Sequence, residues 1–430
     1  MTTTSNASRP RLASTAELRA ELLATYRRVR ALTEALACPL SPEDQTVQSM
    51  PDVSPTKWHR AHTTWFFETF VLTPHVAGYE SPDSAYAYLF NSYYEQVGER
   101  HPRAERGLLS RPSVGEVGAY RRHVDAAMDE MFATADDDVF ACVAHIVETG
   151  CHHEQQHQEL LLMDIKHVLS CNPLAPRYDV RAPFGVHGGA RDARFVSFDG
   201  GPVEVGHHGD AFSFDNETPR HPVLVEPFRL ADRLVTVGEW KAFIADGGYT
   251  EPTLWLSDGW ATVHSQGWIA PLYWHADDGD WTVFTLEGRR RVDDAEPVVH
   301  VSHYEADAFA RWAGARLPTE FEWEHAAGQC DTAREHELHL HPRAANGSST
   351  LAQLDGEVWQ WTASAYLPYP RFAPAAGAIG EYNGKFMSNQ MVLRGGACIT
   401  PPGHTRTTYR NFFPPSARWA FSGVRLAADA

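Results

Sequence analysis

Residues 139–169 read VFACVAHIVETGCHHEQQHQELLLMDIKHVL, and this stretch decides how the N-terminal half of the chain folds. We expect it to form one long helix. Its histidines His153 and His157 are four residues apart, so both imidazoles lie on one helical face with about 5–6 Å between their Cβ atoms. Two imidazoles at that separation can bind one metal ion. Glu159 is offset from this face. We therefore expect its carboxylate to hydrogen-bond a metal ligand and not to bind the metal itself.

Three more helices are expected before this one. Residues 18–36 are amphipathic at helical spacing, residues 55–70 form a second helix with Pro55 suited to its first turn, and residues 114–134 form a third. Four long helices with longer connections predict a helical bundle. The connection over residues 86–111 is long and rich in aromatics, and loops of that length are commonly functional.

A third histidine, His62, lies in the second of these helices, in the sequence WHRAH at 58–62. A bundle can bring it alongside His153 and His157. On spacing alone, three histidines with an open coordination position point to zinc first. They do not form the pattern of two histidines and one carboxylate that is typical of non-haem iron. The alternative is a histidine-rich solvated face, which His152 fits. The residues therefore predict a metal centre and leave the metal open.

The composition changes after the fourth helix. Residues 172–189 hold three prolines and read as a linker, and beyond it short β-like runs alternate with Gly, Pro and Trp residues. The expected organisation is a disordered tail (1–13), a four-helix bundle (14–171), a linker (172–189) and an α+β domain (190–430). Short helices in that last domain are expected from the capping boxes Thr236…Glu239, Ser302…Glu305 and Thr319…Glu322.

The charge and composition of the chain narrow its partners. A formal net charge of -18 without any long basic run argues against a nucleic-acid or anionic-membrane partner. No apolar run reaches the roughly 20 residues that a membrane span needs, and the first residues do not predict a secretory signal. The six scattered cysteines fit a reduced cytoplasm. We expect a soluble cytoplasmic protein with small-molecule substrates, whose oligomeric state these features leave undetermined.

Motifs in both halves of the chain resemble known families. Trp58-x-x-Ala-His62 together with His153-x-x-x-His157-x-Glu159 is similar to the helical half of the sulfoxide synthases of thiohistidine biosynthesis. The second half resembles the formylglycine-generating-enzyme module, and the resemblance covers nearly the whole chain. Its motifs there are GGPVEVG (200–206), DNETPRH (215–221), RLPTEFEW (316–323), GEVWQWT (356–362), LRGG (393–396) and GVRL (423–426).

The resemblance implies a mixed fold, α combined with α/β. It consists of an N-terminal DinB-like four-helix bundle and a C-terminal C-type-lectin-like α+β domain, with the active site between them. It also implies Fe(II) on His62, His153 and His157, which uses O2 to couple a thiol sulfur to C2 of an imidazole and leaves a sulfoxide. The ergothioneine branch of the family uses Nα-trimethylhistidine (hercynine). The ovothiol branch usually carries a third, methyltransferase domain, so a chain that ends at Ala430 favours the ergothioneine branch.

The same resemblance implies where hercynine binds. Gln156 and Asn411 match family positions that hold this substrate. A trimethylammonium group cannot donate N–H hydrogen bonds, so it favours amide oxygens and aromatic faces, and Phe412 and Phe413 offer such faces. The alternative is that both phenylalanines are ordinary core residues.

Arg103 and Arg106 match the pair that holds the carboxylate of the thiol substrate, for which bidentate guanidinium geometry is suited. The alternative is a pair of loop arginines at the surface. Members that use γ-glutamylcysteine carry an Asp and an Arg after the motif Asn, and here Phe413 and Ala417 stand at those positions. An apolar residue there would leave the glutamyl charges unpaired. We therefore expect free L-cysteine as the thiol substrate.

The family also uses an active-site tyrosine in the loop that here spans residues 372–386. Ile379 or Gly380 stands at the expected place, and Tyr382 comes a few residues late. The long N-terminal connection offers Tyr93 and Tyr94 instead. We expect one of these two to supply the phenol, the alternative being that they only anchor the loop.

Three other functions compete with this one. The same architecture could use γ-glutamylcysteine or a selenium donor with hercynine. A DinB-like bundle could also be a non-catalytic module that binds zinc or a thiol. Formylglycine generation relies on a cysteine pair, and Cys330 and Cys398 do not sit in the expected motifs.

Overall fold

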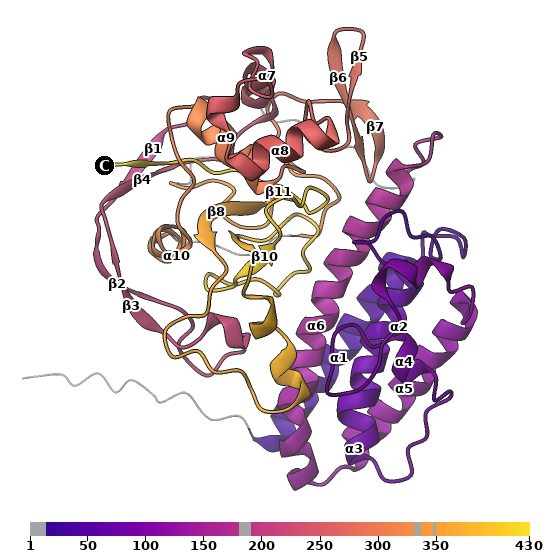
Figure 1. The fold of residues 1–430 in the computed structure, drawn as a ribbon. Helices are drawn as coiled ribbons and strands as arrows, with labels where there is room; N and C mark the ends of the chain where they lie inside the picture. The colour runs from indigo at the N-terminus through magenta and orange to yellow at the C-terminus, as the bar shows by residue number, and fades with distance from the viewer. Residues whose placement is uncertain (1–13, 180–190, 331–336, 347–349) are drawn as a thin grey trace, which may run out of the picture.

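The computed structural model describes residues 14–179, 191–330, 337–346 and 350–430. The expected tail (1–13) and the second part of the expected linker, from residue 180 on, lie outside the described residues. A helical N-terminal half stands beside a C-terminal half of short strands and helices (Figure 1), so the mixed fold class expected from the sequence is confirmed. No helix among the described residues is both long and apolar enough to cross a membrane.

The N-terminal half is built on the four long helices that the sequence predicts, with ends within a few residues of the expected ones. Capping boxes begin two of them, at Ser14 and Ser113, and Asp136 caps a third. The second helix continues into a π-helical turn. The elements are α1 (Thr15–Ala37), α2 (Thr56–Phe67), the π-helix η1 (Glu68–Leu72), α3 (Thr73–His75), α4 (Tyr86–Leu89), the 3-10 helix η2 (Arg103–Leu108), α5 (Val114–Thr134) and α6 (Asp137–Ser170).

A buried ion cluster joins three of these helices. Glu154 of α6 is 0% exposed and accepts hydrogen bonds from Arg30 of α1 at 2.9 Å and from Arg121 of α5 at 2.9 Å. Thr33 Oγ1 donates to the same carboxylate at 2.6 Å. Burial alone would raise the pKa of Glu154, but the two guanidinium groups lower it to about 2. The cluster therefore remains ionised at neutral pH.

Replacing Glu154 with leucine is expected to destabilise the apoprotein by about 3–5 kcal/mol, because Arg30 and Arg121 would lose their one fully buried carboxylate partner and keep only the more exposed Asp125 and Glu34. Denaturant unfolding followed by circular dichroism measures this loss. The matched control is Asp129→Ala, which breaks the solvent-exposed pair with Arg27 at 3.0 Å and should cost no more than about 1 kcal/mol. Equal losses in the two variants would contradict the assignment.

The C-terminal half consists of four small sheets and four α-helices in the described residues. Its helices are α7 (Val237–Ala245), α8 (Ser257–Gln266), α9 (His303–Trp312) and α10 (Glu320–Gln329), with short 3-10 turns η3 (Asp215–Glu217), η4 (Pro252–Leu254), η5 (Ala378–Glu381) and η6 (Gly384–Phe386). The capping boxes expected at Thr236, Ser302 and Thr319 are confirmed at the starts of α7, α9 and α10.

The strands of this half pair mostly antiparallel. The sheets have the orders β1-β4-β12, β2-β3, β5-β6-β7 and β10-β9-β8-β11, and in the last sheet β11 runs parallel to β8. The strands are β1 (Phe195–Phe198), β2 (Gly201–Val205), β3 (His221–Val225), β4 (Phe228–Ala231), β5 (Trp274–Asp277), β6 (Asp280–Thr285), β7 (Gly288–Arg291), β8 (Trp359–Ala365), β9 (Met391–Arg394), β10 (Asn411–Phe413), β11 (Ser422–Gly423) and β12 (Ala427–Asp429).

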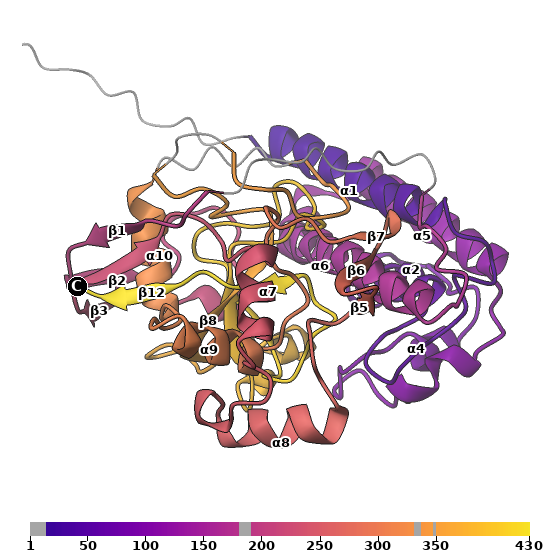
Figure 2. The same ribbon diagram turned by 90° about the horizontal axis from the view of Figure 1, so that it is seen from above.

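Helix α6 joins the two halves. In both views it lies between the other long helices and the C-terminal domain (Figures 1 and 2). Its Glu159 accepts hydrogen bonds from Trp359 Nε1 at 2.7 Å and from Thr400 Oγ1 at 2.5 Å. The side chain therefore faces the C-terminal domain and does not hydrogen-bond a histidine of the expected metal centre, because a residue two positions beyond His157 points to another side of the helix. One hydrophobic cluster continues through both halves.

Candidate metal centre and active site

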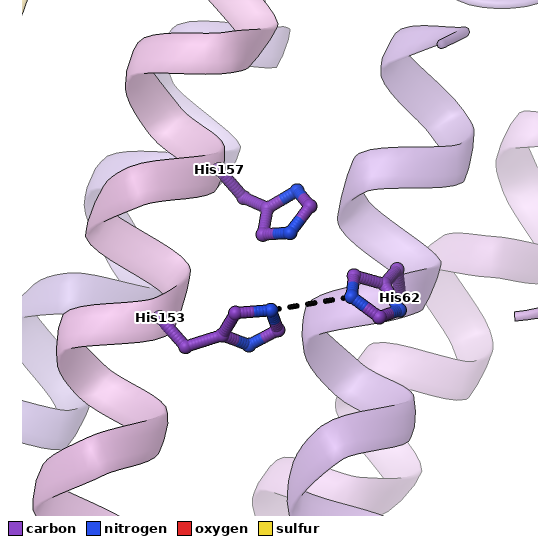
Figure 3. A group of neighbouring side chains, drawn as sticks. All are labelled: His62, His153 and His157. Carbon is purple, nitrogen blue, oxygen red and sulfur yellow. Dashed lines mark hydrogen bonds between the residues drawn. The ribbon is translucent and has the colours of Figure 1, made fainter. Parts of the chain in front are cut away.

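The three histidines singled out in the sequence come together. His62 projects from α2 toward His153 and His157 on α6 (Figure 3), and one ring nitrogen of each lies within 4.8 Å of the other two. The Nε2 atoms of His62 and His153 are 3.2 Å apart. Trp58 stacks on the His62 ring with centroids 4.7 Å apart, which fixes the plane of that imidazole.

The hydrogen bonds of these imidazoles show which ring nitrogens have a lone pair available to bind a metal. His62 Nδ1 lies 2.6 Å from the carbonyl oxygen of Phe90, so it carries the proton and donates it, leaving Nε2 as an acceptor. His157 Nδ1 lies 2.9 Å from His59 Nδ1, which leaves His157 Nε2 for a ligand. Burial lowers the pKa of His153 to about 3 and the pKa values of the other two well below the usual range. All three rings are therefore neutral and able to coordinate.

This donor set fits a divalent transition metal. It offers neutral nitrogens without a carboxylate in the described residues, and such a set is compatible with both zinc and iron. With its Nδ1 already donating to Phe90, His62 can only present a lone pair toward the neighbouring imidazoles. A cation between the rings would satisfy that lone pair.

A cavity of about 310 Å³ opens beside the histidines, between α2, α6 and the C-terminal domain. Its wall includes His153 and His157 together with most of the residues that the sequence assigned to substrates or catalysis. Those residues are Tyr93, Arg103, Arg106, Gln156, Asn411, Phe412 and Phe413.

Arg106 is a buried cation that faces this cavity. It is 3% exposed, and its guanidinium lies 3.3 Å from the centre of the Trp58 ring. It donates to the hydroxyls of Ser54 at 2.9 Å and Ser92 at 3.3 Å, and none of its hydrogen bonds in the described residues goes to a carboxylate. Burial and the nearby Arg103 lower the pKa of this guanidinium, as expected for a buried cation that hydrogen-bonds no carboxylate. An anionic group that enters the cavity would supply a negatively charged partner for Arg106.

Arg103 differs from Arg106 in its exposure to solvent. It lies at the exposed edge of the cavity, where it donates to the backbone carbonyl of Asp52. Two positively charged groups therefore flank one end of the cavity, one buried and one open to solvent. This arrangement suits a carboxylate that enters from solvent.

Gln156 lies at the centre of a hydrogen-bond chain that crosses between the domains. Its Nε2 donates to the Tyr409 hydroxyl at 2.7 Å, and its Oε1 accepts from the Tyr382 hydroxyl. His404 Nε2 lies 3.1 Å from the same Tyr409 hydroxyl. The orientation of the Gln156 amide is therefore fixed by two tyrosines of the C-terminal domain.

The aromatic residues of β10 form one wall of the cavity. Phe412 stacks on Tyr366 with centroids 4.1 Å apart, and Phe413 packs edge-on against Trp419. Asn411 Oδ1 accepts the N–H of Phe412 at 2.9 Å. Ala417 is buried and does not line this cavity.

Three tyrosines lie near the histidines, but only two of them line the cavity. Tyr93 lines the cavity, whereas Tyr94 is fully buried against Trp65 and is not among the lining residues. Tyr382 lines the cavity as well, with its ring centre 5.7 Å from that of His153. Burial raises the pKa of each of these three phenols, so each keeps its proton at neutral pH.

Sequence reasoning did not single out His59 or Asp164, although helical spacing carries a signal for both. His59 precedes His62 by three residues, and Asp164 follows His157 by seven, so each shares a helical face with an expected metal ligand. No local sequence pattern predicts which loops and strands of the C-terminal domain approach α6. These segments contribute Trp359, Tyr409 and His404.

Known proteins match both halves of the chain. The DinB superfamily matches residues 25–161, and the sulfatase-modifying factor enzyme 1-like domain matches residues 187–350 and 345–430. The formylglycine-generating enzyme of Streptomyces coelicolor is 28% identical over 284 residues, which cover 55% of this chain and 89% of that protein. The chain thus falls in a class of two-domain proteins that join a DinB-type bundle to a sulfatase-modifying-type domain, here with a histidine group at the junction.

Relatives that match along nearly the full length specify the family. The hercynine oxygenase of Mycolicibacterium smegmatis is 32% identical over 416 residues, covering 89% of this chain and 92% of that protein. The hercynine oxygenase of Mycobacterium tuberculosis is 32% identical over 414 residues, covering 88% and 92%. The chain belongs to the hercynine oxygenase family and is an oxygenase.

Proposed function

We propose that this enzyme joins the sulfur of L-cysteine to C2 of the imidazole of hercynine and forms the sulfoxide of ergothioneine biosynthesis. In the balanced reaction the imidazole C–H and the thiol S–H bonds break and a C–S bond forms. One oxygen atom of O2 becomes the sulfoxide and the other leaves as water. The observation that carries the proposal is the histidine centre at the edge of a cavity that also holds a buried arginine cation without a carboxylate partner.

Fe(II) is the proposed metal, held by His62, His153 and His157, and when bound it would supply the activation of O2. The chain's own residues do the rest. Arg106, with Arg103, would hold the cysteine carboxylate, and the cavity beside the histidines would hold both substrates. Holding both reactants at one centre lowers the entropic cost of bringing sulfur beside the imidazole carbon.

Hercynine would occupy the side of the cavity formed by Gln156 and β10. The Gln156 oxygen and the Asn411 amide offer acceptors, and Phe412 and Phe413 offer aromatic faces to a trimethylammonium group. Tyr93, as the member of the N-terminal tyrosine pair that lines the cavity, would donate the proton needed near the metal.

L-cysteine is favoured over γ-glutamylcysteine by the walls of the cavity. Phe413 stands at one of the two positions that the resemblance assigns to the γ-glutamyl group, and it adds an apolar ring to the cavity wall. An unpaired charge against an apolar wall is costly. We expect a higher kcat/KM for cysteine in steady-state assays that offer each thiol with hercynine, and a clear preference for γ-glutamylcysteine would contradict this part of the proposal.

The decisive experiment is anaerobic reconstitution with Fe(II), followed by addition of hercynine, cysteine and O2 and mass spectrometry of the product. We expect one hercynylcysteine sulfoxide per O2 consumed. Competition with a selenium donor tests the alternative substrate. Stoichiometric zinc after anaerobic purification, with no O2 uptake after iron loading, would instead favour a non-catalytic module.

Replacing Arg106 with methionine is expected to reduce kcat/KM for the thiol by about 30-fold or more, because losing one partner of a buried ion pair costs about 2–5 kcal/mol. The KM for hercynine should stay nearly unchanged, since that substrate is assigned to the other side of the cavity. Arg100→Met is the matched control, because Arg100 lies in the same loop and pairs with Glu95 at the surface. An equal loss for both substrates would contradict the assignment of Arg106.

A further inference from the structure

Behind the metal centre lies a buried chain of hydrogen bonds that the proposed chemistry does not use. His59 Nδ1 is 2.9 Å from His157 Nδ1, and His59 Nε2 is 3.0 Å from Asp164 Oδ2. His59 is 3% exposed and Asp164 is 2% exposed. The same Asp164 oxygen accepts the backbone N–H of Ser54 at 2.7 Å.

The protons of this chain have one consistent arrangement when His157 binds a metal. A metal on Nε2 requires the proton of His157 on Nδ1, so that ring donates to His59 Nδ1. His59 must then carry its own proton on Nε2 and donate it to Asp164. Every N–H in the chain therefore points from the metal toward the carboxylate.

The other two ligands have no such connection. His62 donates to the neutral carbonyl of Phe90, and His153 Nδ1 has no hydrogen-bond partner among the residues that the structure describes. No carboxylate belongs to the described donor group itself. Asp164 is thus the negative charge that hydrogen bonds connect to an otherwise neutral set of ligands.

We propose that His59 and Asp164 are positioning residues that fix the tautomer and ring orientation of His157 and convey the charge of Asp164 to the metal centre. The inference rests on the metal site of the proposed function. Metal-bound histidines commonly donate their second N–H to a carboxylate or carbonyl, and removing such partners typically costs about 10–100-fold in metal affinity. Here a second imidazole stands between the ligand and the carboxylate.

Ser54 extends this chain toward the substrate end of the cavity. Its backbone N–H donates to Asp164, and its hydroxyl accepts from Arg106. One residue therefore contacts both the carboxylate behind the metal and the buried cation assigned to the thiol substrate. Ser54, two residues before α2 begins, therefore links the two charged groups.

The test is metal binding by the full-length protein, with Co(II) as a spectroscopic probe and Fe(II) under anaerobic conditions, each titrated against a competing chelator. His59→Leu should weaken binding by about 10–100-fold. His59→Gln should recover most of this loss, because an amide can accept from His157 and donate to Asp164. Asp164→Asn keeps the hydrogen bonds but removes the charge, so we expect about 10-fold weaker binding and a shifted Co(II) absorption spectrum.

His341→Leu is the matched control, because it breaks a buried pair with Glu296 at 3.2 Å in the C-terminal domain, away from the cavity lining. It should leave metal affinity and the Co(II) spectrum unchanged. An Asp164→Asn variant with wild-type affinity and spectrum, or equal losses in His59→Gln and His59→Leu, would overturn the inference. Wild-type protein that binds neither metal would overturn the proposed metal site as well, so the two failures are distinguishable.

Discussion

Replacing His62 with alanine is expected to abolish sulfoxide formation. The variant removes one of three neutral nitrogens that lie within 4.8 Å of one another, and the two remaining histidines share a single helix. Metal-ion catalysis supplies several kcal/mol, so we expect turnover to fall by more than about 1,000-fold. The iron content of anaerobically loaded protein should fall in parallel, and both quantities are measured on the same sample.

His152→Ala is the control for this prediction. His152 neighbours His153 on α6, but its ring stacks on Phe212 at a centroid distance of 3.9 Å and does not join the group of three histidines. We expect its variant to keep both iron and activity. If the His62 variant retained stoichiometric iron and wild-type turnover, the assignment of the centre would be wrong.

The sequence predicts that His153 and His157 lie side by side because that pairing depends only on helical periodicity. His153 and His157 are neighbours on any regular helix, and their helix was identifiable from residues 139–169. The capping boxes are predicted from the sequence for the same reason, since each depends on two residues three positions apart. Local rules of this kind do not depend on the rest of the fold.

What the sequence does not predict is the approach of the two domains. Glu159 was expected beside a ligand, yet it bonds to Trp359 and Thr400, because α6 faces the C-terminal domain along that side. The contact of Tyr382 with Gln156 spans 226 positions of the chain. Pairings this distant depend on how irregular loops pack, and no short pattern encodes that packing.

Replacing Tyr93 with phenylalanine is expected to lower sulfoxide formation by about 100-fold while leaving the binding of both substrates nearly intact. A proton donated in the transition state contributes about 10²–10⁴-fold to a rate, and burial keeps the Tyr93 phenol protonated. Tyr93 lines the cavity and contacts Tyr382 and Phe386, so a ring without its hydroxyl can keep the same packing. The measurements are kcat, both KM values and the ratio of sulfoxide to other thiol oxidation products.

Phenylalanine at the two neighbouring tyrosines separates catalysis from positioning. Tyr94→Phe should leave kcat close to wild type, because Tyr94 is buried behind the cavity wall. Tyr382→Phe removes the hydrogen bond to the Gln156 oxygen, so its main effect should be a higher KM for hercynine. If Tyr382→Phe lowered kcat and changed the product ratio while Tyr93→Phe did neither, the proton would come from the C-terminal domain. In that case Gln156 would act by orienting the catalytic phenol, and its own variants should reproduce the loss in kcat.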